Sequence, residues 1–297
     1  MIFKQTIAIL GGDTRQCSLA TRLAKEGLAV RIFGLPQEGL PPEIVSFSDW
    51  REAIADAVAV VLPLPVSPDG IRLNLPLAPS AESVPIATLF AAIPTTCLLA
   101  GGKFSPSVRA YAEECGLTVF DYFKSEELQL KNALPTAEGA VSILMRECPR
   151  TVSGLSVGVT GFGRVSRALV RLLLAMNAKV TVAARKRADL KEAEAMGCKT
   201  VHLSGGRALS ALCDTTEFIF NTVPHWIFSA DILAEMPRNS LIIDLASTPG
   251  GVDATAASAN GIRVIWALSL PGKYAPATAG EIIAETLLSY MREEGLL

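Results

Sequence analysis

The chain has 297 residues, of which 50% are hydrophobic and 19% charged, so we expect a folded protein of two domains rather than a disordered chain. Its 27 basic and 29 acidic residues give a formal net charge of −2, which excludes a general affinity for nucleic acid or for an anionic membrane. Only two histidines and no Cys-x-x-Cys pair are present, and proline or arginine interrupts each apolar stretch before the ~18 residues of a membrane span, so we predict a cytoplasmic protein without a metal site.

The first half of the chain alternates short apolar strands with helical segments. A tight turn, Gly11-Gly12-Asp13, follows the first strand and leads into a helix, and another helix is predicted over Ser107–Cys115. The strands are predicted at Ile7–Leu10, Ala29–Phe33, Val58–Leu62, Cys97–Ala100 and Leu117–Phe120.

The second half repeats this order. Its first turn is Gly161-Phe162-Gly163, and a helix is predicted over Arg164–Met176. The strands are predicted at Ser156–Thr160, Lys179–Ala183, Phe218–Asn221, Leu241–Asp244 and Ile262–Ile265. Short strands that are apolar on both faces and separated by helices are typical of a parallel sheet covered on both sides. The predicted fold is therefore α/β, with two Rossmann-like doubly wound parallel-sheet domains and a cleft between them.

Two helices are predicted to connect these domains. Ala140, Ile143, Leu144 and Glu147 lie at helical spacing after Pro135-Thr136, which indicates a crossover helix. The last helix, about Thr278–Arg292, is apolar along one face and is expected to return toward the first domain. The predicted parts are a substrate-side domain at 1–130, the crossover helix at 131–150, a nucleotide-binding domain at 151–275 and the C-terminal helix at 276–297.

A dinucleotide-binding fingerprint follows the first strand of the second half. Gly161-x-Gly163-x-x-Ser166 lies between a predicted strand and a predicted helix. The first glycine permits a tight turn, the second lets the backbone approach a pyrophosphate, and the third position must be small for helix and strand to pack. The phosphates are expected at the N-terminal end of the helix, where unpaired N–H groups donate hydrogen bonds.

The end of the next strand indicates which cofactor is bound. In NAD-binding domains an Asp or Glu about 20 residues further on binds the ribose 2′-hydroxyl. Here Ala183-Ala184-Arg185-Lys186-Arg187 offers three cations and no carboxylate. Such cations suit a 2′-phosphate and predict NADP, the alternative being a solvated basic loop. The residues predicted to bind the cofactor are Gly161, Phe162, Gly163, Arg164, Val165, Arg185, Lys186, Asn221, Thr222, Val223, Pro224, Asp244, Ala246 and Ser247.

The corresponding turn of the first half lacks the fingerprint, and Asp13 would repel a phosphate, so we assign that half to the substrate. Several segments along the chain resemble the family of dipicolinate synthase A subunits in the expected order. The most specific are the opening turn, the Asn132 segment and the Asp244 segment, whereas the glycine fingerprint is shared with many dehydrogenases. The matching segments are Gly11–Gln16, Asn132–Gly139, Gly161–Val165, Asn221–Pro224, Asp244–Gly251, Leu270–Gly272 and Ala275–Gly280.

The resemblance implies a sporulation enzyme of Gram-positive spore formers. Such an enzyme would oxidise a dihydrodipicolinate, or its hydroxy-tetrahydro precursor, to dipicolinate with NADP⁺, together with the flavoprotein-like B subunit of dipicolinate synthase. The wider architecture is similar to that of 2-hydroxyacid dehydrogenases. His225 departs from the family pattern, because a fixed histidine is not expected there.

A dicarboxylate substrate needs cations and orientation more than it needs acid–base groups. Cations that follow strands, such as Arg15, lie where ligands bind in open α/β sheets, although each is also typical of a surface. For proton transfer we consider Glu138 on the crossover helix and His225 after the Asn221–Pro224 turn; an exposed carboxylate and a loop histidine are the alternatives. The residues predicted to bind substrate are Gly12, Asp13, Arg15, Gln16, Lys103, Thr136, Lys273 and Thr278.

Two other functions compete with this dehydrogenase. A non-catalytic NADP(H)-binding subunit that organises a catalytic partner would explain the scarcity of acid–base residues. A hydrolase with tightly held NAD, similar to S-adenosylhomocysteine hydrolase, is disfavoured by Arg185 and Lys186, because that cofactor needs a carboxylate there. The sequence leaves the ring substrate, the proton acceptor and a homo-oligomeric state open.

Overall fold

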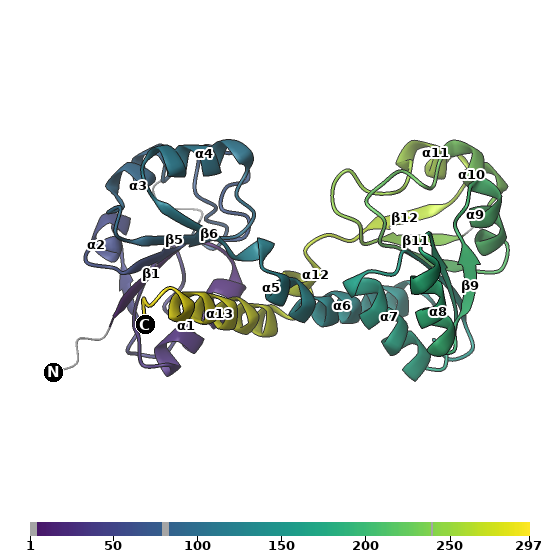
Figure 1. Cartoon of the computed structure of the whole chain (residues 1–297), viewed down its shortest axis with the longest axis horizontal. Helices are drawn as coiled ribbons and strands as arrows, with labels where there is room; N and C mark the ends of the chain where they lie inside the picture. Colours follow the sequence, from purple (N-terminus) through teal and green to yellow (C-terminus); the bar gives the residue numbers. More distant parts are fainter. Residues whose placement is uncertain (1–4, 79–82, 239) are drawn as a thin grey trace. The chain divides into compact units, whose positions relative to one another are not determined.

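A computed structural model of the chain describes residues 5–78, 83–238 and 240–297. The chain divides into two compact units. Unit 1 comprises Met1–Asn132 and Ala275–Leu297, and unit 2 comprises Ala133–Tyr274. Each unit contains one six-stranded parallel sheet with helices packed on it (Figure 1), which confirms the predicted α/β class and the two Rossmann-like domains.

The sheet of unit 1 has the order β3-β2-β1-β4-β5-β6. Its strands are β1 (Thr6–Leu10), β2 (Ala29–Phe33), β3 (Val45–Phe47), β4 (Ala59–Val61), β5 (Leu98–Gly101) and β6 (Thr118–Asp121). Its helices are α1 (Thr14–Lys25), α2 (Trp50–Ile54), α3 (Ile86–Ala92), α4 (Pro106–Glu114), the 3₁₀ helix η1 (Tyr122–Lys124), α5 (Glu126–Lys131) and α13 (Pro276–Glu293).

The sheet of unit 2 has the order β12-β11-β10-β7-β8-β9. Its strands are β7 (Ser156–Thr160), β8 (Lys179–Ala184), β9 (Lys199–His202), β10 (Phe218–Asn221), β11 (Leu241–Asp244) and β12 (Arg263–Trp266). Its helices are α6 (Ala133–Glu147), α7 (Arg164–Ala175), α8 (Arg187–Ala195), α9 (Gly206–Cys213), α10 (Ala230–Glu235), α11 (Ala254–Ala259) and α12 (Leu270–Tyr274).

Both sheets follow one winding scheme. Counted within each unit, the strand order is 3-2-1-4-5-6, the order of a doubly wound dinucleotide-binding fold. In this order the winding reverses between the first and fourth strands, which are β1 and β4 in unit 1 and β7 and β10 in unit 2. Ligands of open α/β sheets bind beyond the carboxyl ends of the strands at this reversal.

The C-terminal helix α13 belongs to unit 1 and packs against α1 (Figure 1). Its apolar side chains Ile283, Leu287 and Met291 are buried in the same core as strand β1. Gly280 makes the close approach possible, because a Cβ atom there would lie 2.2 Å from the Arg15 backbone oxygen. A segment far from the rest of unit 1 along the chain thus completes its core.

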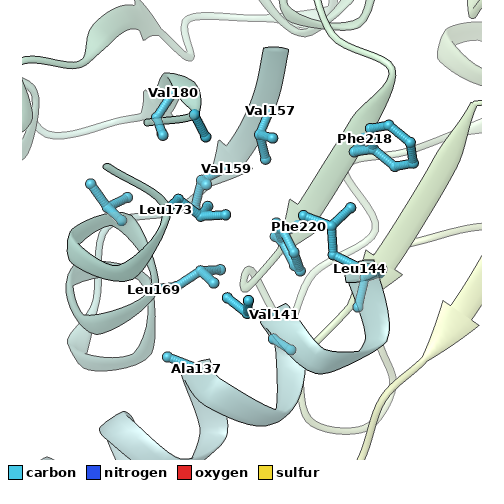
Figure 2. Packing of buried hydrophobic residues seen from close by; sticks show 14 of the residues in the cluster. Ala137, Val141, Leu144, Val157, Val159, Leu169, Leu173, Val180, Phe218 and Phe220 are labelled. Atoms are coloured by element: carbon cyan, nitrogen blue, oxygen red, sulfur yellow. The ribbon is translucent and has the colours of Figure 1, made fainter. Parts of the chain in front are cut away.

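One core of unit 2 lies between one face of its sheet and helices α6 and α7, and a second core lies between the other face and helices α9, α10 and α11. Figure 2 shows Val141 and Leu144 of α6 and Leu169 of α7 directed toward Val159 and Phe220 of the sheet. Helix α6 begins at Ala133, before the Pro135-Thr136 pair that the sequence suggested as its start. This packing fixes α7, and with it the glycine turn that precedes the helix.

No helix within the described parts of the chain combines the length and apolar character that a membrane span requires. Among the same residues, no cluster of three or more His, Cys, Asp or Glu side chains is arranged to hold a metal ion.

Candidate functional site

A cavity of about 930 Å³ opens in unit 2 at the carboxyl ends of β7, β8 and β10. This position is the winding reversal of the sheet, and the volume is within the roughly 300–1,000 Å³ of ligand pockets in proteins. The cavity is lined by Gly161, Phe162, Gly163, Arg167, Ala184, Arg185, Lys186, Asp189, Leu203, Gly205, Gly206, Leu209, Val223, Pro224, His225 and Ile227.

The glycine turn forms one wall of this cavity. Gly161 has a φ of +84°, a left-handed conformation that favours glycine, and a Cβ atom there would lie 2.5 Å from Thr222 Oγ1. Gly163 is the N-cap of α7, and a Cβ atom there would have no neighbour within 4 Å. The backbone at Gly163 therefore faces open space at the N-terminal end of a helix, as a pyrophosphate requires.

Small polar side chains hold this turn in place. Ser166 is fully buried, and its Oγ lies 2.7 Å from Thr222 Oγ1. Thr222 Oγ1 donates to the backbone oxygen of Thr160 at 2.8 Å, so the Ser166 hydroxyl donates to Thr222. The third position of the fingerprint thus links α7 to the ends of β7 and β10.

Asn221 and Asp244 form a buried network behind the cavity. Asn221 Nδ2 donates to Asp244 Oδ1 at 2.8 Å and to the Val223 backbone oxygen at 3.1 Å, while its Oδ1 accepts from Thr160 Oγ1 at 2.6 Å. Asp244 also accepts from the backbone N–H groups of Ala246 and Gly251. These bonds occupy both side chains, which therefore position the loops after β10 and β11.

Two cations stand where β8 ends. Arg185 and Lys186 follow Ala184, are exposed and line the cavity. The backbone at Arg185 is held by the neighbouring strand, because His202 Nε2 donates to the Arg185 oxygen at 3.0 Å. This end of the cavity therefore presents positive charge on a fixed segment.

Arg167, which the sequence analysis did not single out, ties the glycine turn to helix α8. Its guanidinium lies 4.8 Å from the centre of the Phe162 ring and donates to the Phe162 backbone oxygen. It also pairs with Asp189 at 3.1 Å and with Glu192 at 2.8 Å. The hydrogen bond from Arg167 is the main reason why the pKa of Glu192 lies below its usual range. Asp189 is thus a carboxylate in the cavity wall, already paired with a cation.

The first turn of unit 1 is built differently. Asp13 caps α1 by accepting from the Arg15 backbone N–H at 3.0 Å, and the Asp13 backbone N–H donates to Gln16 Oε1 at 3.1 Å. Side-chain atoms of Gln16 fill the space beside Gly12, where a Cβ atom would lie 2.5 Å from them. A phosphate therefore has no place at this turn.

Arg15 is buried and engaged within unit 1. Its Nη2 donates to Asp13 Oδ2 at 2.8 Å and to the Leu64 backbone oxygen at 2.6 Å, and its Nε donates to Asp13 Oδ1 at 2.9 Å. Beside it, Gln16 Nε2 is buried without a hydrogen-bond partner among the described residues. Lys103 is exposed after β5, and its backbone N–H donates to Asp121 Oδ1 at 3.0 Å.

The cavity brings together part of the predicted cofactor set. The members that line it are Gly161, Phe162, Gly163, Arg185, Lys186, Val223 and Pro224, and the predicted catalytic His225 joins them. Those that do not line it are Arg164, Val165, Asn221, Thr222, Asp244, Ala246 and Ser247. Arg167, Asp189 and the Gly205-Gly206 turn are lining residues that the sequence analysis missed.

The other predicted site residues are distributed between the units. Glu138 is exposed on α6 of unit 2 and does not line the cavity. Thr136 on α6 and Lys273 on α12 also belong to unit 2. Thr278 is exposed in the first turn of α13, in unit 1 with Gly12, Asp13, Arg15, Gln16 and Lys103. Their roles in catalysis and substrate binding stay predictions.

Two protein families match successive parts of the chain. Residues 6–123 match the family described as the N-terminal domain of the dipicolinate synthase A subunit. Residues 120–255 match the NAD binding domain of D-isomer specific 2-hydroxyacid dehydrogenases. The second match covers the glycine turn and the cavity, and it supports an oxidoreductase that uses a nicotinamide cofactor.

Individual relatives extend the likeness to nearly the whole chain. The A subunit of dipicolinate synthase from Bacillus subtilis (strain 168) is 27% identical over 289 residues, which are 97% of this chain and 96% of that protein. The crystal structure of the A subunit from Bacillus halodurans has a TM-score of 0.88 at 26% identity, covering 97% of each chain. The crystal structure of the protein from Bacillus subtilis has a TM-score of 0.86 at 27% identity, covering 99% of this chain and 97% of that one. These likenesses confirm the resemblance that the motifs indicated.

Proposed function

We propose that this chain, which is similar along nearly its whole length to the A subunit of dipicolinate synthase, oxidises a dihydrodipicolinate to dipicolinate with NADP⁺. A hydroxy-tetrahydro precursor serves equally if it first loses water. The observation that carries the proposal is the cavity of unit 2, which has an open glycine turn on one side and the cations Arg185 and Lys186 on another. The wider likeness to the two Bacillus structures supports the choice of substrate.

The cavity residues fit a nicotinamide dinucleotide. Gly163 and the first N–H groups of α7 would hold the pyrophosphate, and Val223 and Pro224 would border the nicotinamide end. When bound, the cofactor accepts a hydride from the ring carbon of the substrate, and the ring releases a proton as it becomes aromatic. The chain's own contribution is to orient the two reactants and to keep their charges paired.

The cations at the end of β8 favour NADP over NAD. A 2′-phosphate carries about two negative charges, which a guanidinium and an ammonium group match. Asp189 is the carboxylate of the cavity wall, and it pairs with Arg167. Among the charged residues that line the cavity, Arg185 and Lys186 therefore have no acidic partner. We therefore assign Arg185, and with it Lys186, to the 2′-phosphate.

The substrate is assigned to unit 1, where Arg15 supplies a buried cation at the carboxyl end of β1. Gln16 Nε2, which has no partner among the described residues, is a further donor suited to a carboxylate oxygen. The relatives are named as one subunit of a synthase, which supports a complex with a second, flavoprotein-like subunit. The proposed role in sporulation rests on what the resemblance of the motifs to dipicolinate synthase A subunits implies.

A steady-state assay tests the proposal. The purified chain, by itself and with its partner subunit, is given dihydrodipicolinate with NADP⁺ or NAD⁺, and reduced nicotinamide and dipicolinate are both measured. We expect one reduced nicotinamide for each dipicolinate, with NADP⁺ preferred. If the chain binds NADP⁺ but no preparation that contains it reduces the cofactor, the proposed oxidation is wrong. If the pair keeps its activity when NADP⁺ binding by this chain is abolished, the chain is a non-catalytic organising subunit.

A further inference from the structure

We propose that Arg167 sets the cofactor preference of the cavity by neutralising the α8 carboxylates Asp189 and Glu192, without itself binding the 2′-phosphate. The inference rests on the proposed use of NADP. It concerns a residue on α7, directly after the last position of the fingerprint, whose side chain reaches the neighbouring helix.

The first step is the charge balance around the cavity. Arg167, Arg185 and Lys186 are three cations, and Asp189 and Glu192 are two carboxylates. With Arg167 present the cations are in excess, and the excess lies at the end of β8. Without Arg167 the Asp189 carboxylate in the cavity wall would be unpaired beside Arg185 and Lys186, and the attraction for a 2′-phosphate would weaken.

The second step is the position of Asp189. It lines the same cavity as Arg185 and Lys186 but lies in the first turn of α8 rather than at the end of β8. NAD-selecting sites bind the ribose 2′-hydroxyl through a carboxylate near this place. Here the guanidinium of Arg167, 3.1 Å away, engages that carboxylate. Releasing Asp189 would both repel a 2′-phosphate and offer an acceptor to the 2′-hydroxyl of NAD.

Arg167 also contacts the glycine turn, in addition to its ion pairs with α8. Its guanidinium stacks on Phe162 and donates to the Phe162 backbone oxygen, so it also steadies the glycine turn. That turn holds the pyrophosphate, which NADP and NAD share. A loss of this support, or of a direct contact with the pyrophosphate, would weaken both cofactors equally. Only the loss of the charge changes the ratio of the NADP and NAD dissociation constants.

The experiment measures the dissociation constants of NADP⁺ and NAD⁺ by calorimetry for the full chain. Arg167→Met keeps the aliphatic stem and removes the charge. We expect NADP⁺ to bind about tenfold more weakly relative to NAD⁺ than in the wild type. Because the effect is electrostatic, the shift in the ratio should shrink between 0.1 and 1 M salt, as the screening length falls from about 10 Å to about 3 Å.

Two further variants complete the test. Arg167→Met combined with Asp189→Asn and Glu192→Gln restores the charge balance but not the contacts of Arg167 with Phe162. This triple variant should return the ratio of the NADP⁺ and NAD⁺ dissociation constants to within about threefold of the wild type. Lys179→Met, which removes an exposed cation at the opposite end of β8 from the cavity, should leave the ratio unchanged.

The outcomes separate this inference from the proposed function. A wild-type chain that does not prefer NADP⁺ contradicts the proposed cofactor, and this inference with it. A wild type that prefers NADP⁺, with an Arg167→Met variant that keeps the same ratio, contradicts the role of Arg167 alone. A preference for NADP⁺ that stays reduced in the triple variant would likewise overturn the charge mechanism.

Discussion

Two glycines of the same turn, Gly161 and Gly163, meet different physical requirements. Gly161 needs its left-handed backbone and the space beside Thr222, so a side chain there strains the fold. Gly163 has an extended backbone with a φ of −86° and open space around it, so a side chain there meets no protein atom. The first glycine is therefore required by the fold, and the second by the pyrophosphate that we propose to bind there.

Replacing Gly163 tests this distinction. In Gly163→Val the added methyl groups enter the space assigned to the pyrophosphate, so we expect NADP⁺ binding to fall below detection while the melting temperature stays near that of the wild type. Gly161→Val should instead lower the melting temperature, because its side chain meets Thr222 Oγ1. Calorimetry and thermal denaturation of both variants check the prediction. A Gly163→Val chain that binds NADP⁺ normally would place the pyrophosphate elsewhere.

Replacing Arg185 tests the assignment of the 2′-phosphate. Arg185→Asp turns an attractive charge into a repulsive one, so NADP⁺ should lose on the order of 1.5–3 kcal/mol of binding free energy while NAD⁺ keeps its affinity. Lys179→Asp, at the opposite end of β8, makes the same charge change far from the ribose site and serves as the control. Equal losses for both cofactors in Arg185→Asp would contradict the assignment.

The cavity residues that were predicted from the sequence belong to short motifs within a few positions of a strand end. The glycine turn and the cations after β8 are short runs at fixed places relative to a strand, so their spacing alone points to a nucleotide. Arg167 and Asp189 lack such a signal, because each is one polar residue among others on an amphipathic helix. Only the packing of α7 beside α8 brings them together, and that contact has no counterpart in the sequence pattern.

At the scale of elements, the predicted strands include those that the sheets bury and also the edge strands β6 and β12. β7 and β10 are buried along most or all of their length, and their apolar residues mark them clearly in the sequence. β3 and β9 lie at sheet edges, carry exposed polar positions and were missed. An edge strand pairs on one side only and needs no continuous apolar run, so its sequence resembles that of a loop.

The contact between α1 and α13 predicts whether a side chain at Gly280 stabilises or destabilises the chain. Alanine is ordinarily favoured over glycine inside a helix by about 1 kcal/mol. At Gly280, however, a Cβ atom would lie 2.2 Å from the Arg15 backbone oxygen, and backbone cannot move aside cheaply. We therefore expect Gly280→Ala to destabilise the chain by about 1–3 kcal/mol in urea denaturation. A stabilised variant would mean that the helices do not approach this closely.

At the scale of the whole molecule, the two units share one strand order but differ in their first turns. In unit 2 the turn is open at Gly163, whereas in unit 1 Asp13 and Gln16 close it. The sequence indicated this difference, since only one turn carries the fingerprint. A chain with one nucleotide-binding unit and one substrate-binding unit should respond to mutations in each with separate kinetic effects.

Arg15→Ala tests this separation. Losing one charge-assisted contact with a substrate carboxylate should cost on the order of 1.5–3 kcal/mol, which raises the Michaelis constant for the dicarboxylate by roughly one to two powers of ten. The dissociation constant of NADP⁺ should stay unchanged, because the nucleotide cavity is lined by unit 2. Arg15→Lys should recover only part of the loss, because an ammonium group cannot reproduce the guanidinium geometry.

The structure adds a control to this experiment. Nε and Nη2 of Arg15 already donate to Asp13 and to Leu64, so Nη1 is the group left to meet a substrate. Arg22→Ala removes another ion pair of α1, with Glu26, and leaves Asp13 and Arg15 in place, so it should lower the melting temperature without raising the Michaelis constant. Arg15→Ala should lower the melting temperature and also raise the Michaelis constant. If the two variants lower stability alike and neither changes the Michaelis constant, Arg15 is a structural charge of α1, and the substrate binds without it.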